Sequence, residues 1–105
     1  INIFVSELKL DLKSIKDLCF KMSDKIDNLF MIIVSKTDEK VFISCFISKE
    51  LAEEKELNAS NIVKELSSLI DGNGGGQKFF ATAGGKNIDG IESVLSQSEK
   101  IISQI

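Results

Sequence analysis

The chain has 105 residues, a length that suits a single domain and leaves no room for a second hydrophobic core. Its composition, 43% hydrophobic and 28% charged, is that of an ordinary globular protein and excludes a disordered or membrane-embedded chain. The net charge of −3 argues against a broad basic face for nucleic acid, although it leaves room for a small local patch.

Two missing residue types exclude further classes of function. The chain contains no histidine, which rules out a Ser-His-Asp triad, a His-ligated zinc and a histidine general base. All 13 basic residues are lysine, so the bidentate readout of guanine by arginine and the stacking of arginine on bases are unavailable. We therefore predict that this chain has no catalytic residue and binds no metal or cofactor of its own.

The two cysteines lie within apolar periods and lack the spacing of metal ligands. We expect Cys19 and Cys45 to be reduced core residues of a cytosolic protein, with a Cys19–Cys45 disulfide as the alternative. The longest apolar run, residues 29–34, is far shorter than the roughly 20 residues that span a bilayer. The chain opens at Ile1 without a basic signal region, so we expect a piece of a longer protein that carries no secretory signal.

The first half of the chain predicts a strand, a helix and a hairpin. Residues 1–5 are β-branched and aromatic and predict a strand, and Asp11 is placed to cap a helix that ends near Asp27. Residues 29–34 and 41–47 predict two strands of a hairpin at the centre of the sheet. The apolar stripe of the helix comprises Leu12, Ile15, Leu18, Cys19, Met22 and Ile26.

The second half predicts two more helices and one strand. The acidic residues 49–57 indicate a solvated face or loop, and a helix then starts at residues 58–61 with Gly72 as its stop. Residues 78–83 predict a strand, and Asn87 can cap a final helix. The resulting order, β-α-β-β-α-β-α, predicts a small layered α/β sandwich with a mixed sheet packed by helices.

All seven glycines lie between Gly72 and Gly90. A dinucleotide-binding fingerprint does not fit, because Gly74, Gly75 and Gly76 follow a predicted helix and precede a strand, and no Gly-Lys-Ser/Thr triplet marks a phosphate-binding P-loop. A helix cap followed by a tight turn is a sufficient explanation for Gly72, but it does not require three further consecutive glycines. For the triple glycine we favour a backbone surface that accepts a phosphate or ribose.

A second pair of glycines precedes the last predicted helix. Gly84 and Gly85 lead toward its N-terminus, where free N–H groups and the helix dipole favour an anion, and Lys86 stands beside them.

The run GGGQKFFATAGG, with NIVKELSSLIDGNG before it and NIDGIESVLSQ after it, resembles the DHHA1 domain, most closely the version at the C-terminus of alanyl-tRNA synthetases. The similarity covers nearly the whole chain and implies that residues 1–105 form one DHHA1-like C-terminal domain. The positions equivalent to the motif of the family are Gly74, Gly75, Gly76, Ala81, Ala83, Gly84 and Gly85.

The resemblance implies a function for the parent chain and for this domain. The parent would be a cytoplasmic, ATP-dependent alanine-tRNA ligase that uses magnesium and zinc and clears mischarged Ser or Gly in a separate editing domain. This domain would be noncatalytic and would position tRNA(Ala) at its elbow, with no membrane partner. The residues expected to contact the nucleic acid are Gly74, Gly75, Gly76, Gln77, Lys78, Gly84, Gly85 and Lys86.

Two alternatives remain open at this stage. In the related DHH phosphoesterases the motif commonly reads Gly-Gly-Gly-His and helps to bind a phosphorylated substrate; Gln77 occupies that histidine position and favours the synthetase branch. The other alternative is a homodimerisation module, which a large exposed apolar patch on one helix would support.

Overall fold

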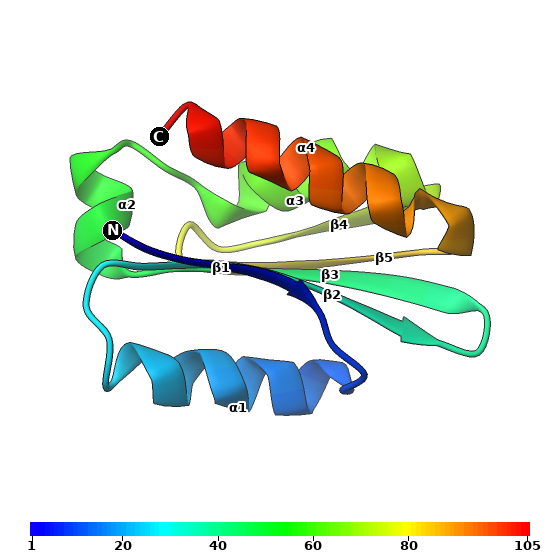
Figure 1. The fold of residues 1–105 in the computed structure, drawn as a ribbon, viewed down its shortest axis with the longest axis horizontal. Coiled ribbons are helices and arrows are strands. Elements are labelled where there is room, and N and C mark those ends of the chain that lie inside the picture. The colour runs from blue at the N-terminus through cyan, green and yellow to red at the C-terminus, as the bar shows by residue number, and fades with distance from the viewer.

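A computed structural model describes residues 1–105 as a five-stranded mixed sheet between two helical layers (Figure 1). The strand order is β1-β2-β3-β5-β4; β1 runs parallel to β2, and every other neighbouring pair is antiparallel. The predicted layered sandwich with a mixed sheet is therefore confirmed. The strands are β1 (Asn2–Glu7), β2 (Leu29–Thr37), β3 (Lys40–Ile47), β4 (Gly72–Gly76) and β5 (Phe80–Gly85).

The helices divide unequally between the two faces of the sheet. Helix α1 (Leu12–Ser23) lies alone on one face, whereas α3 (Ala59–Ser67) and α4 (Ile91–Ser103) cover the other (Figure 1). The short α2 (Lys49–Glu54) lies at one end of the sheet. Two 3-10 turns, η1 (Ser68–Ile70) and η2 (Ile88–Gly90), follow α3 and precede α4.

The start of α1 confirms the predicted cap. The Ser14 backbone N–H donates to Asp11 Oδ1 over 2.7 Å, and this hydrogen bond lowers the pKa of the Asp11 carboxyl below its ordinary value. The helix ends at Ser23, earlier than the predicted end near Asp27.

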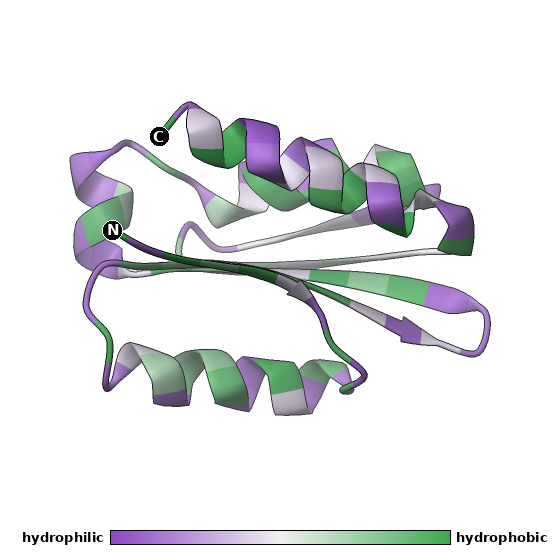
Figure 2. Cartoon of the chain, in the orientation of Figure 1, coloured by the Kyte–Doolittle hydropathy of each residue, from purple (hydrophilic) through white to green (hydrophobic).

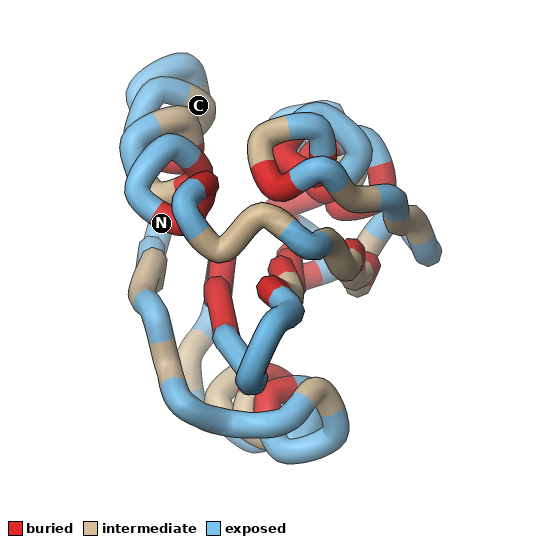
Figure 3. The backbone as a smooth tube through the Cα atoms, turned by 90° about the vertical axis from the view of Figure 1, so that its right-hand side faces the viewer, coloured by how far each residue is buried: buried red, intermediate tan, exposed pale blue.

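The sheet separates two hydrophobic cores. Along β2, Phe30 and Ile32 belong to the core under α3 and α4, while Met31 and Ile33 belong to the core under α1. Successive strand residues point to opposite faces, so a strand buried on both sides reads as one continuous apolar run. Figure 2 shows the hydrophobic sides of the helices turned toward the sheet, and Figure 3 shows the buried residues gathered along it.

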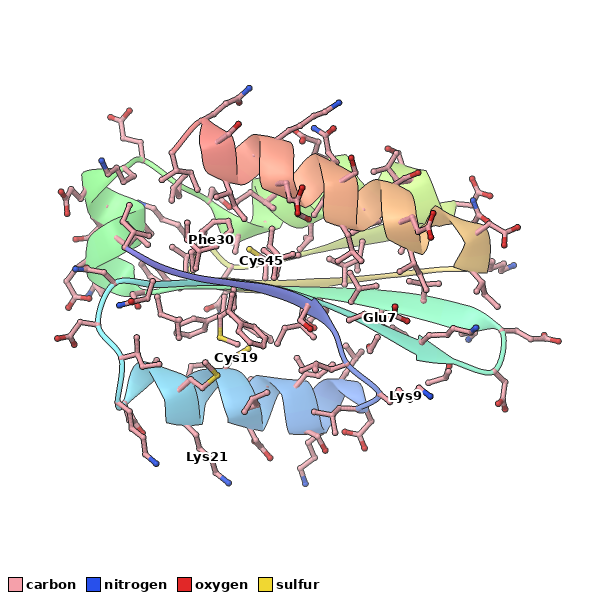
Figure 4. The ribbon with its side chains drawn as sticks, viewed as in Figure 1. Glu7, Lys9, Cys19, Lys21, Phe30 and Cys45 are labelled. Atoms are coloured by element: carbon pink, nitrogen blue, oxygen red, sulfur yellow. The ribbon has the colours of Figure 1, made fainter.

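The two cysteines lie on opposite sides of the sheet. Cys19, on α1, faces one core and Cys45, on β3, faces the other (Figure 4). Both thiols are free and buried, which confirms the expected reduced core residues. Burial raises the pKa of the Cys19 thiol to about 11 and raises that of Cys45 further, so both stay protonated at neutral pH.

Residues 49–54 form a helix, whereas the sequence predicted a solvated face or loop. Leu51 and Ala52 are buried in the larger core, and the acidic residues around them face outward. The six-residue helix is too short for a clear periodic pattern, so tertiary burial of two apolar side chains decides its conformation.

The largest difference from prediction lies in the glycine segment. Gly72–Gly76 is not a loop but the edge strand β4, paired antiparallel with β5. Gly72 is not the helix stop; Asp71, with a φ of 50°, holds the left-handed position that caps η1. Strand β5 starts at Phe80 rather than at residue 78 and includes Gly84 and Gly85.

Glycine is a steric requirement at alternate positions of β4. A Cβ atom on Gly72 would collide with the carbonyl oxygen of Gly84, and one on Gly74 would collide with the Thr82 carbonyl and with Ala83. Gly75 differs, because its Cβ would lie 3.3 Å from Lys64 Cε, a flexible side-chain atom. The strand can therefore approach β5 this closely only with glycine at the alternate positions.

This geometry predicts a contrast between two alanine variants. Gly74→Ala should lower the free energy of unfolding by roughly 1–3 kcal/mol or more, because backbone has to move to admit the methyl group. Gly75→Ala, the matched control, should change it by less than about 1 kcal/mol, since Lys64 can move aside. Urea unfolding followed by circular dichroism measures both, and equal losses would contradict the close approach of β4 to β5.

Thiol reactivity gives a second prediction. At about pH 8 the raised pKa of Cys19 leaves about a hundredfold less thiolate than an ordinary thiol has, so iodoacetamide should modify the folded protein much more slowly than the protein unfolded in urea. Mass spectrometry counts the modified cysteines over time. Equal rates in the two states would show that the thiols are not buried.

Candidate functional site

One part of the sheet surface is left without a covering helix. Helix α1 packs mainly against β2 and β3, so the same side of β5 and β4 stays open. On this side three cross-strand pairs join β3 to β5: Phe42 with Gly84, Ser44 with Thr82, and Phe46 with Phe80. We call the surface formed here by β5, β4 and Phe42 the open face; it contains two neighbouring pockets.

The first, the lysine pocket, lies around the end of β5 and has a volume of about 430 Å³. Lys40, the first residue of β3, lines it together with Lys86, which directly follows β5. Two ammonium groups thus share the lining with one carboxylate, that of Asp71, and the rest includes glycine backbone and the Phe42 ring. The lining residues are Lys40, Phe42, Asp71, Gly72, Asn73, Gly84, Gly85 and Lys86.

The second, the aromatic pocket, lies beside the first half of β5 and has a volume of about 270 Å³. Lys16 and Phe20 line it from α1, one helical turn apart. The lining combines apolar groups with a cation and neutral polar groups. Its full lining is Lys16, Phe20, Gly75, Gly76, Gln77, Phe80, Ala81 and Thr82.

A cluster of rings forms the base of the aromatic pocket. The Phe20 and Phe46 ring centroids lie 5.5 Å apart with planes at 80°, an edge-to-face arrangement, and the Phe20 and Phe80 centroids lie 5.9 Å apart. Lys16 Nζ lies 5.7 Å from the centroid of the Phe80 ring, within the range of a cation–π contact. These contacts hold a cation beside an aromatic surface.

Most of the predicted contact residues line one of the two pockets. Gly75, Gly76 and Gln77 line the aromatic pocket, and Gly84, Gly85 and Lys86 line the lysine pocket.

Gly74 and Lys78 are the exceptions. Gly74 is paired with Ala83 within the β4–β5 ladder and lines neither pocket. Lys78 lies apart, in a separate pocket that also contains Glu53 and Glu56, and its Nζ is 6.0 Å from the Phe79 ring centroid.

The expected helix N-terminus after Gly84 and Gly85 has a different form. Both glycines belong to β5, and the chain then passes through Asn87 into η2. The Asn87 side chain already accepts a hydrogen bond from the Asp89 N–H, over 3.1 Å. The pocket at Lys86 is therefore built by strand backbone rather than by a helix end.

Nine pocket residues were not among the contact residues or motif positions predicted from the sequence. Only Phe20 carried a signal, because it lies outside the apolar stripe of an amphipathic helix, where a large aromatic residue is unexpected. The others come together through the register of the sheet and the placement of α1. The missed residues are Lys16, Phe20, Lys40, Phe42, Asp71, Gly72, Asn73, Phe80 and Thr82.

The structure contains no cluster of three or more Cys, Asp or Glu side chains placed to hold a metal ion. None of its helices is both long enough and apolar enough to cross a membrane.

Comparison with known proteins gives a consistent result. The model of the DHHA1 domain family matches residues 1–104. An alanine–tRNA ligase of Christiangramia forsetii is 47% identical over 102 residues, which are 97% of this chain and 12% of that protein. The corresponding enzyme of Cytophaga hutchinsonii is 37% identical, again over 97% of this chain and 12% of the enzyme. The chain thus spans about an eighth of the length of the relatives that it matches.

A solved structure has the same fold. The C-Ala domain from Aquifex aeolicus alanyl-tRNA synthetase superposes with a TM-score of 0.80, covering 97% of this chain and 89% of that chain, at 22% sequence identity. The arrangement of sheet and helices is therefore shared with that domain.

Proposed function

The chain belongs to the DHHA1 domain family, and we propose that it is the noncatalytic, tRNA-binding C-terminal domain of an alanyl-tRNA synthetase. In this proposal the parent is a cytoplasmic, ATP-dependent ligase with magnesium and zinc elsewhere in its chain. The domain holds tRNA(Ala) near its elbow while other parts of the enzyme charge and edit it. The similar alanine–tRNA ligases support this assignment.

The open face is the observation that carries the proposal. It brings together three lysines, Lys16, Lys40 and Lys86, against a single carboxylate, although the chain as a whole has a net charge of −3. A local excess of positive charge on a flat, glycine-rich surface suits the close approach of a phosphate backbone. The amides of Asn73 and Gln77 add neutral hydrogen-bond donors at the rim.

The number of lysines sets the expected strength of binding. Three contacts with phosphates give a salt slope of roughly −2 to −3, much smaller than that of a strongly basic protein. Binding by the isolated chain should accordingly be weak and should weaken further as salt rises. Such a domain adds to the affinity of a larger enzyme rather than binding tightly alone.

Homodimerisation is the second candidate, and one observation favours it. Ile1 and Ile3 are 57% and 43% exposed; Ile3 lies on β1, an edge strand of the sheet, and Ile1 directly precedes this strand. The criterion stated from the sequence was an apolar patch on one helix, whereas the exposed apolar side chains here lie at an edge of the sheet. Sedimentation velocity distinguishes a dimer from the monomer.

The proposed elbow contact predicts a preference between two RNAs. Full-length tRNA(Ala) should bind more tightly than an acceptor-stem minihelix, because the minihelix lacks the folded elbow that the open face would recognise. Fluorescence anisotropy titrations of both RNAs at two salt concentrations measure the difference and the slope. Equal affinities for the two RNAs would contradict the proposed elbow contact. Failure to bind either RNA would contradict the tRNA-binding function.

A second prediction separates the lysines of the open face from the others. The double variant Lys40→Gln, Lys86→Gln should bind tRNA more weakly at every salt concentration and should reduce the salt slope by about 2, or about 1 for each lost phosphate contact. The double variant Lys78→Gln, Lys100→Gln removes the same two charges outside the two pockets and serves as the matched control. Equal losses in the two double variants would contradict the placement of the RNA on the open face.

A further inference from the structure

We propose that the aromatic pocket binds one unpaired nucleobase, stacked on the ring of Phe20. This inference rests on the proposed tRNA-binding function and adds which chemical group of the RNA enters which pocket. The lysine pocket then takes the neighbouring phosphates, because the two pockets adjoin along β5.

Phe20 is the starting observation. It is the one exposed member of the seven phenylalanines, with 45% of its surface open to solvent, and it lies on the polar side of α1. A single exposed apolar side chain is common and by itself indicates no function. The surroundings of this ring distinguish it from an incidental surface residue.

The Phe20 ring is fixed in position by two other rings. Phe46, only 6% exposed, meets it edge to face at 5.5 Å, and Phe80 lies at 5.9 Å with its plane tilted by 42°. A ring already held in place loses little conformational entropy when a ligand stacks on it. The exposed part of Phe20 is thus a rigid, flat, apolar surface at the base of a pocket.

The size and lining of the pocket select a planar group. Its volume of about 270 Å³ lies just below the roughly 300–1,000 Å³ typical of ligand sites, which suits one base better than a larger ligand. The apolar lining consists of two aromatic rings and Ala81, with no branched aliphatic side chain. Flat rings complement a base more closely than they complement an apolar peptide side chain.

The polar rim matches the rest of a nucleotide. The Gln77 side-chain amide can both donate and accept hydrogen bonds, as the edge of a base requires, and the Thr82 hydroxyl lies beside it in the lining. The Gln77 backbone N–H donates to the Phe80 carbonyl over 2.9 Å, which fixes the turn that carries this amide. Lys16 supplies a cation for the phosphate of the same nucleotide.

The base has to be unpaired. Within a helix both faces of a base are stacked on its neighbours, and the end of a stem exposes a base pair, so a pocket sized for one base takes a base from a loop or single strand. The geometry therefore assigns the aromatic pocket to a loop nucleotide of the bound RNA, not to a stem.

The test uses a short single-stranded RNA that carries 2-aminopurine, whose fluorescence is quenched by stacking. The wild-type chain should quench the probe as it binds. Phe20→Leu keeps an apolar side chain but removes the ring, and it should weaken binding by roughly tenfold or more. Phe20→Tyr keeps the ring and should bind within about twofold of the wild type. Thermal melting of each variant verifies that it is folded.

The outcomes distinguish this inference from the proposed function. Quenching that disappears in Phe20→Leu and persists in Phe20→Tyr supports stacking. Suppose that the wild type binds tRNA(Ala) and that Phe20→Leu binds both the tRNA and the probe as tightly as the wild type does. Stacking on Phe20 is then wrong, while the tRNA-binding function stands. Equal weakening by the leucine and tyrosine variants would also overturn stacking, because it would indicate a purely apolar contact such as that with a protein segment.

Discussion

The close approach of β4 to β5 is the constraint on which the open face depends. Glycine has a low intrinsic preference for strands, so local propensity does not explain why β4 forms. The strand forms because residues without side chains can approach the β5 backbone closely and pack beneath α3. Any larger residue at Gly72 or Gly74 would collide with that backbone. The fifth strand widens the sheet beyond the region that α1 covers, and the open face results.

The width of the sheet explains why one face stays partly open. Five strands spaced by about 4.8 Å span about 20 Å, whereas one helix with its side chains is about 10 Å across. The pair α3 and α4 can cover one face, but α1 alone covers only the strands nearest to it. The uncovered positions carry small, hydroxyl or aromatic residues, including Thr82, Gly84 and Phe80, instead of a row of aliphatic side chains.

Local patterns predicted much of the fold correctly. The continuous apolar run of β2, the Asp11 cap and the buried cysteines all follow from side-chain periodicity and from the chemistry of single residues. The predictions failed for α2 and β4. Helix α2 is too short for periodicity to identify it, and the pairing of β4 depends on a distant partner strand, which no local property of five residues records.

The sequence by itself determined the layered α/β architecture, the reduced buried thiols and the resemblance to the DHHA1 domain, because these depend on the order and identity of residues. Only the tertiary structure decided which side chains share a pocket. Lys40 and Lys86 are far apart in the chain but line one pocket through the β3–β5 register, and the packing of α1 places Lys16 in the second pocket. Lys78, adjacent to the motif in sequence, lies elsewhere. Proximity in space depends on long-range strand pairing and helix packing, and neither is encoded in a short segment.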